Sequence, residues 1–300
     1  MAEKDILEKV LLSHADVFAD CVNTLAYEGN GRLAETDLQP APTESFYQGK
    51  EKTRSQFCDK SFYRMGDGEV RAQYIIENET RIRHRQVLRK ASYQGGAYRE
   101  QLDSEKPAYP VIGMVLDWTQ KTSRIPLSLR KLMQEAGALQ EELELTDDVD
   151  LAVYHMRNLP GEVRDRFTSD MGFVADYLNE GSFEGRKNQP IHHMEALCAM
   201  MEALTGDARF TEQINELMSG KEEGEEVYMC EYIDMLEARG EKRGMEIGEK
   251  IGTKIGERKG ENRLAELIGI LCKEGKYKEI ETVSADSDTR QEFYRLYNIL

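Results

Sequence analysis

The sequence has few cysteines, no long apolar run and no excess of positive charge. Its five cysteines are odd in number and widely spaced, so they predict neither a disulfide framework nor a CxxC zinc site. No stretch approaches the ~20 apolar residues that a membrane helix needs. The first residues, Met-Ala-Glu-Lys-Asp, lack the basic and then apolar layout of a secretory signal. We therefore expect a cytoplasmic protein with no membrane partner.

The charge balance restricts how the protein can bind a polyanion. Lysine and arginine number 40 against 56 acids, which gives a net charge of −16 over 300 residues. This balance excludes a protein that coats nucleic acid with its whole surface, but it allows a small basic site on an acidic body. The hydrophobic fraction of 40 % is enough for one large core or two modest ones.

The first 126 residues alternate helix and strand signals. Apolar residues recur every three or four positions over 5–27, and Gly66-Asp67-Gly68-Glu69 is a hairpin signal between two strand-like segments. The predicted elements are a helix at 5–27, strands at 57–65 and 70–79, a helix at 80–102 and a buried strand at 109–118. They predict a mixed α/β core.

Beyond residue 126 the sequence is mainly helical in character. Residues 127–230 carry helical periodicity, and from Gly240 to Gly260 a glycine recurs every fourth residue among charged residues and isoleucine. Each glycine weakens an isolated helix by about 1 kcal/mol relative to alanine. The tract is therefore either a flexible tether or a helix stabilised by a partner. We favour a helix, which predicts a homo-oligomer formed through the C-terminal helical region, followed by helices at 262–273 and 289–300.

The hairpin is the segment that suggests chemistry. A turn centred near Asp67-Gly68 places Asp59 opposite Ile76 and beside Glu77. Glu77 and Glu79 leave the same face of their strand, so three carboxylates gather at one end of the hairpin. Carboxylates this close repel unless a divalent cation lies among them, and Mg²⁺ on carboxylates is typical of phosphodiester-cleaving sites. The alternative is that these side chains simply face solvent.

The segment after the hairpin is basic. Residues 80–99 contain six lysines and arginines and no acid. On a helix beside the carboxylates, these cations would lie where a phosphate backbone could bind, although a solvated helix face is the alternative. The residues that we expect to contact DNA phosphates are Arg81, Arg83, Arg85 and Arg89.

A set of short motifs in a fixed order resembles a known family. The motifs are Phe18-Ala19-Asp20 with Asn23, Asp59, Ile76-Glu77-Asn78-Glu79-Thr80, Arg85, Tyr93-Gln94-Gly95-Gly96-Ala97-Tyr98-Arg99 and Tyr109-Pro110-Val111-Ile112. Their order and spacing resemble the recombination-promoting nuclease/transposase family of the PD-(D/E)XK nuclease superfamily. The glycine tract is also similar to the C-terminal region of many members.

This resemblance implies a DNA endonuclease core that depends on Mg²⁺, or on Mn²⁺ in its place. It implies that Asp59 and Glu77 are metal ligands, and that Asp20 on the first helix completes the metal site. Glu79 occupies the third catalytic position, where the superfamily has lysine and this family commonly has glutamine. Gln94 stands where members usually carry aspartate. We expect a metal-dependent endonuclease that hydrolyses DNA phosphodiester bonds, and these departures motivate the alternative of an inactive member that binds DNA or protein and self-associates. RNA is a third possible substrate.

The predicted domain organisation follows from these features. A PD-(D/E)XK nuclease-like domain is predicted at 1–135, and a helical region follows at 136–236. The glycine tract occupies 237–262, and C-terminal helices occupy 263–300. The predicted fold class is α/β, with a mostly α-helical C-terminal half.

Overall fold

A computed structural model describes residues 9–48, 53–102, 104–121, 124–212, 214 and 225–299. The chain divides into two compact units, Met1–Tyr232 and Ile233–Leu300. The first unit is an α/β structure around a five-stranded mixed sheet, and the second is helical. Among the described residues, every helix is too short or too polar to cross a membrane.

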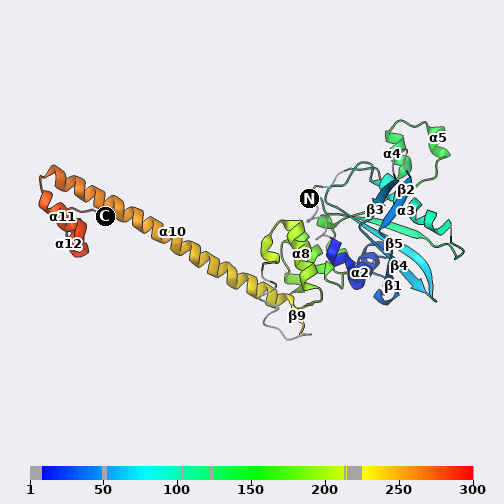
Figure 1. Ribbon diagram of the computed structural model, residues 1–300, viewed down its shortest axis with the longest axis horizontal. Helices are drawn as coiled ribbons and strands as arrows, with labels where there is room; N and C mark the ends of the chain where they lie inside the picture. The colour runs from blue at the N-terminus through cyan, green and yellow to red at the C-terminus, as the bar shows by residue number, and fades with distance from the viewer. Residues whose placement is uncertain are drawn as a thin grey trace. The chain divides into compact units, whose positions relative to one another are not determined.

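The central sheet of the first unit has the strand order β1-β4-β5-β6-β7. Its strands are β1 (Leu38–Pro40), β4 (Lys60–Gly66), β5 (Glu69–Glu79), β6 (Val111–Asp117) and β7 (Ala152–His155). Strands β1, β4 and β5 lie side by side in Figure 1. β1, β4 and β5 pair antiparallel, whereas β5, β6 and β7 pair parallel. A separate antiparallel pair is formed by β2 (Glu44–Gln48) and β3 (Thr53–Phe57). The parallel strands end at one edge of the sheet, and this edge carries the candidate site.

The β4–β5 hairpin turns at Asp67 and Gly68, as the sequence predicts. Both residues have positive φ, 53° and 78°, which suits a tight hairpin turn. The predicted register is wrong by one residue, because a β-bulge between Arg64 and Met65 shifts the pairing. Lys60, rather than Asp59, is therefore the partner of Ile76.

Two helices differ from the bounds that the sequence predicts. The first helix is interrupted at His14, whose backbone is extended between η1 (Leu11–Ser13) and α2 (Ala15–Ala26), and residues 5–8 lie outside the described part. The second, α3 (Gln86–Leu102), begins six residues later than predicted. Residues 80–85 form a loop instead, and Ile82 of this loop is buried against Val87.

The sheet is covered by helices on both faces. Phe18 of α2 packs on Phe62 of β4 with ring centroids 4.6 Å apart. On the other face, Val115 of β6 packs against Val87 of α3. Because side chains alternate along a strand, Glu77 and Glu79 of β5 lie on the α3 face.

The rest of the first unit is helical, apart from β7 and a short strand pair. β7 joins the central sheet although it lies beyond residue 135, so the sheet extends past the predicted end of the nuclease-like domain. The remaining elements, in chain order, are η2 (Glu35–Asp37), α4 (Leu129–Glu135), α5 (Gln140–Glu144), η3 (Met156–Asn158), α6 (Gly161–Arg164), α7 (Met171–Glu180), η4 (Glu184–Arg186), β8 (Pro190–Ile191), α8 (Met194–Thr205), η5 (Ala208–Phe210) and β9 (Val227–Tyr228).

The glycine tract is helical throughout. It lies inside α10 (Met229–Lys273), which continues into the second unit. The C-terminal end of α10 packs with α11 (Tyr277–Ala285) and α12 (Ser287–Leu296). Their small core is formed by Leu267, Leu271, Val283, Tyr294 and Ile299.

Truncating the aromatic contact between α2 and the sheet tests this packing. Phe62 is 4 % exposed, so Phe62→Ala should lower the free energy of unfolding by about 3–5 kcal/mol, because it removes buried apolar surface and leaves a cavity. Urea denaturation measures this change. Leu102→Ala is the control, because Leu102 is 82 % exposed, and it should change stability by less than about 0.5 kcal/mol.

Candidate functional site: an acidic cluster bridged by arginine

Asp59 and Glu77 lie beside each other at the end of the hairpin. The backbone N–H of Asp59 donates to Glu77 Oε1 at 3.3 Å, and the backbone N–H of Asn78 donates to Asp59 Oδ2 at 2.7 Å. The bulge shifts the register so that Lys60 pairs with Ile76, and Asp59, just before β4, lies beside Glu77. The structure therefore brings together the first two residues of the predicted site.

Arg89 of α3 bridges Glu77 and Glu79. Its Nη2 lies 3.0 Å from Glu77 Oε2, and its Nη1 pairs with Glu79 Oε1. Nη2 also donates to the Tyr93 hydroxyl at 2.8 Å. Gln86 adds a further hydrogen bond to Glu79 Oε1, also 2.8 Å long. Arg89, which the sequence analysis assigned to a DNA phosphate, thus contacts carboxylates instead.

Burial shifts the pKa values of the charged side chains in this cluster. Glu77 is 4 % exposed, and burial together with the charge of Asp59 raises its pKa to about 8, although Arg89 opposes the rise. Burial also raises the pKa of Glu79, again against the effect of Arg89. Burial lowers the pKa of Arg89, but the hydrogen bond to Tyr93 and the two carboxylates outweigh it and raise this pKa further. The guanidinium stays charged and compensates the acids.

A second cation contacts the third carboxylate. Lys9 Nζ lies 2.7 Å from Asp59 Oδ1. The three carboxylates of Asp59, Glu77 and Glu79 are therefore accompanied by two positive side chains from the protein itself. Arg89 and Lys9 thus compensate most of the negative charge of the three acids.

Asp20 does not join this cluster. Its carboxylate accepts hydrogen bonds from the backbone and hydroxyl groups of Thr168 and Ser169, with lengths between 2.7 and 3.1 Å. Asp20 is 8 % exposed, and it holds the loop before α7 against α2. The family resemblance implies a role for Asp20 in a metal site, and in this structure its carboxylate has a structural role.

The arrangement does not fit the Mg²⁺ ion that the resemblance implies. In the part of the chain that the structure describes, no group of three or more His, Cys, Asp or Glu side chains is placed to hold a metal ion. Oxygen atoms of Glu77 and Glu79 that could face a metal are hydrogen-bonded to Arg89. We therefore derive no catalytic step through a metal.

The three remaining predicted phosphate contacts lie in the loop between β5 and α3. Arg81, Arg83 and Arg85 are exposed, and they are not on a helix as predicted. Arg83 is close enough to Glu79 to lower the pKa of its carboxyl group. The loop therefore places positive charge in solvent beside the cluster.

Sequence reasoning missed an aspartate and a histidine at the same edge of the sheet. Asp117 of β6 is the register partner of Glu79, and its Oδ2 lies 2.6 Å from Nδ1 of His155 on β7. Asp117 and His155 are the last residues of two neighbouring parallel strands, so the position of each at the end of its strand is the sequence signal for their proximity. β7 itself was not predicted, so His155 had no assigned place.

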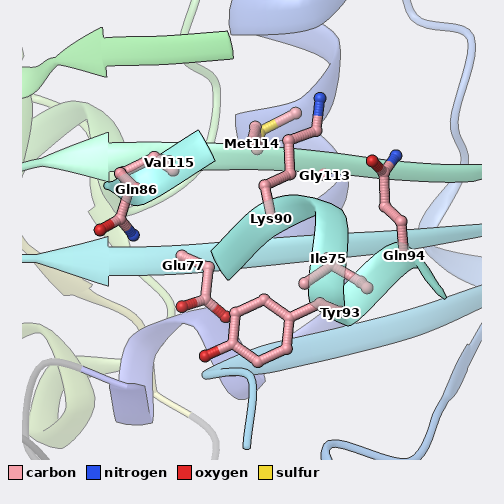
Figure 2. Close-up of a pocket in the computed structure, with 9 residues that line it drawn as sticks. All are labelled: Ile75, Glu77, Gln86, Lys90, Tyr93, Gln94, Gly113, Met114 and Val115. Carbon is pink, nitrogen blue, oxygen red and sulfur yellow. The ribbon is translucent and has the colours of Figure 1, made fainter. Parts of the chain in front are cut away.

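A small cavity lies beneath the cluster, between α3 and the sheet. Figure 2 shows Glu77 and Tyr93 at one side of it and Gln94 at the other. Its volume of about 10 Å³ has room for roughly one water molecule. Gln94 Nε2 donates to the Val111 carbonyl at 2.7 Å, so it fixes α3 to β6.

No family model matches the chain, and neither a curated protein nor a solved structure does so.

The raised pKa of Glu77 gives a pH-dependent prediction. Burial and the charge of Asp59 raise the pKa of Glu77 to about 8 in the folded protein, from an ordinary pKa of 4.5. Its contribution to stability is therefore complete below pH 4.5 and is lost as the pH rises towards 8. Glu77→Gln should be nearly neutral at pH 5 and should stabilise the protein by about 1–3 kcal/mol at pH 9.

Chemical denaturation at the two pH values measures this difference. Glu69→Gln serves as the control, because Glu69 is an exposed residue on the same strand. It should change stability by less than about 0.5 kcal/mol at both pH values. Equal effects of Glu77→Gln at pH 5 and pH 9 would contradict the raised pKa.

The structural role of Asp20 predicts a loss of stability. Asp20→Ala leaves the N–H and hydroxyl groups of Thr168 and Ser169 without their acceptor, and should lower the free energy of unfolding by about 2–4 kcal/mol. Thermal or urea denaturation without any added metal measures it. Unchanged stability would mean that the carboxylate is available for another role.

Proposed function

We propose that this chain is a DNA-binding protein with a PD-(D/E)XK nuclease-like core, of the recombination-promoting nuclease/transposase type, in which Arg89 replaces a metal ion. The observation that carries the proposal is the pairing of Arg89 with Glu77 and Glu79 beside an exposed loop of three arginines. The succession α2, β1, β4, β5, α3, β6, with β5 and β6 parallel, is consistent with such a core.

The arginine loop supplies the proposed phosphate contacts. Arg81, Arg83 and Arg85 are exposed within a protein of net charge −16, so the local field rather than the total charge determines where a polyanion binds. The neighbouring acids would repel DNA if they were uncompensated. Arg89 and Lys9 reduce this repulsion, and the loop presents its positive charge to solvent.

A second candidate function is metal-dependent cleavage of DNA. The observation that favours it is the proximity of Asp59 and Glu77 at the end of the hairpin, as expected for the acid pair of such a nuclease. Arg89 would have to leave Glu77 before a divalent cation could take its place. The two functions therefore differ in whether Arg89 stays in the cluster when Mg²⁺ is present.

Substitutions in the loop test DNA binding. The triple variant Arg81→Gln/Arg83→Gln/Arg85→Gln should weaken binding of a fluorescent DNA duplex at low salt. It should also reduce the slope of log affinity against log salt concentration by up to ~3, because each lost phosphate contact removes about 0.9. Fluorescence anisotropy measures both quantities. Labelled RNA in the same titration determines which nucleic acid is preferred.

The matched control removes the same charge elsewhere in the first unit. Arg32→Gln/Lys106→Gln/Lys121→Gln changes three exposed cations outside the loop and should leave the salt slope within about 1 of the original protein. Equal weakening by the two triple variants would mean that binding follows net charge alone, and would contradict a site at the loop.

A plasmid assay separates the two candidate functions. The intact protein should leave supercoiled plasmid uncut in Mg²⁺ and in Mn²⁺, as it does in EDTA, because Arg89 holds the carboxylates. Metal-dependent nicking that the double variant Asp59→Ala/Glu77→Ala loses would establish the nuclease instead.

A further inference from the structure

Three isoleucines on α10 form an exposed apolar row in the second unit. Ile247, Ile251 and Ile255, named here the isoleucine stripe, are 55 %, 53 % and 49 % exposed. Further along the same helix, Leu267 and Leu271 are fully buried by α11 and α12. The stripe has no such cover, although isoleucine gains about 1.5–3 kcal/mol when it is buried.

The backbone beside the stripe is open to close approach. Gly248 and Gly252 lie next to the isoleucines, and a Cβ atom added at either would meet no atom within 4 Å. Rows of side chains spaced by four residues are inclined to the helix axis, and two such rows interdigitate at a crossing angle of about −50°. The surface is therefore shaped for another helix that carries the same row.

A second copy of this chain carries that row, and the charges of α10 favour one orientation. The residues from Met229 to Lys250 contain six acids and four bases, a net charge of −2. The equal number of residues from Gly252 to Lys273 contain five bases and three acids, a net charge of +2. An antiparallel pair places each negative half against a positive half, whereas a parallel pair places like against like.

The position of Arg258 beside the isoleucine stripe also favours the antiparallel orientation. It lies seven residues, or about two turns, after Ile251, so it is on the face of the stripe. In a parallel pair Arg258 would face its own copy. In an antiparallel pair about Ile251 it lies opposite Gly244, where no side chain obstructs it.

We infer that α10 is a self-association surface, on which the isoleucine stripes of two copies cross antiparallel about Ile251. The interface is two-fold symmetric, with each stripe packed on the other. This inference stands apart from the proposed DNA binding, because it uses none of the residues of the acidic cluster or the arginine loop.

Two substitutions of equal charge test the surface. The intact chain should be a dimer in sedimentation equilibrium, and Ile251→Glu should raise the dimer dissociation constant at least ~100-fold, because it places two carboxylates in the apolar contact. Thr253→Glu is the matched control, since Thr253 lies on the opposite face of the same helix. It should leave the dissociation constant within about threefold.

Spin-label distances test the orientation. Glu241 and Glu261 lie ten residues before and after Ile251, so each is about 15 Å from the two-fold axis along the helix. Labels at Glu241→Cys should be roughly 30 Å apart in an antiparallel dimer and below about 20 Å in a parallel one. Chains labelled at Glu241→Cys mixed with chains labelled at Glu261→Cys should give the short distance. Cys230 and Cys272 are replaced by serine, and the other cysteines are buried.

Each outcome decides the inference. A monomeric intact chain, or an Ile251→Glu variant that dimerises as well as the Thr253→Glu variant, would overturn the stripe as the interface. A dimer with short distances at both single-label positions would overturn the antiparallel arrangement. Circular dichroism confirms that both glutamate variants keep the helical content of the intact chain. Loss of DNA binding leaves these results unchanged, so the two proposals fail separately.

Discussion

The contact of Arg89 with Glu77 and Glu79 is the interaction on which the first unit depends. The hairpin brings three acids to one end of β5, and burial makes their negative charge costly. Arg89 offsets this cost from α3, with Tyr93 one turn later holding the guanidinium. The contact therefore holds α3 on the sheet and also compensates the negative charge of the acids. An apolar helix face alone would leave the acids to repel one another.

Local sequence patterns predicted the elements better than their ends. The Asp67-Gly68 turn is where the pattern placed it, because few residues adopt positive φ as readily as glycine and aspartate. The bulge at Arg64 and Met65 has no such signal, and it moved the register by one residue. Ile82, in the loop before the late start of α3, is buried against Val87, and helical propensity does not contain such a tertiary contact.

The acids of the site were predictable, but their partners were not. Strand alternation places Glu77 and Glu79 on one face whatever the rest of the fold does. Arg89 was recognisable as one base in a basic segment, yet only the true start of α3 shows that it faces the sheet. For Asp20, a motif suggested a metal ligand. In the structure its carboxylate accepts hydrogen bonds from Thr168 and Ser169, about 150 residues away in the sequence, and no local pattern indicates these partners.

The net charge of the chain limits how strongly one arginine loop could hold DNA in the proposed function. A body of net charge −16 repels DNA at long range, so a single loop of three arginines is a weak attachment on its own. If α10 pairs two copies, one particle carries two such loops. A long polyanion that bound both loops would make its second attachment at an effective concentration set by the first. Pairing through an interface without DNA contacts would therefore strengthen the proposed DNA binding without any further basic residue.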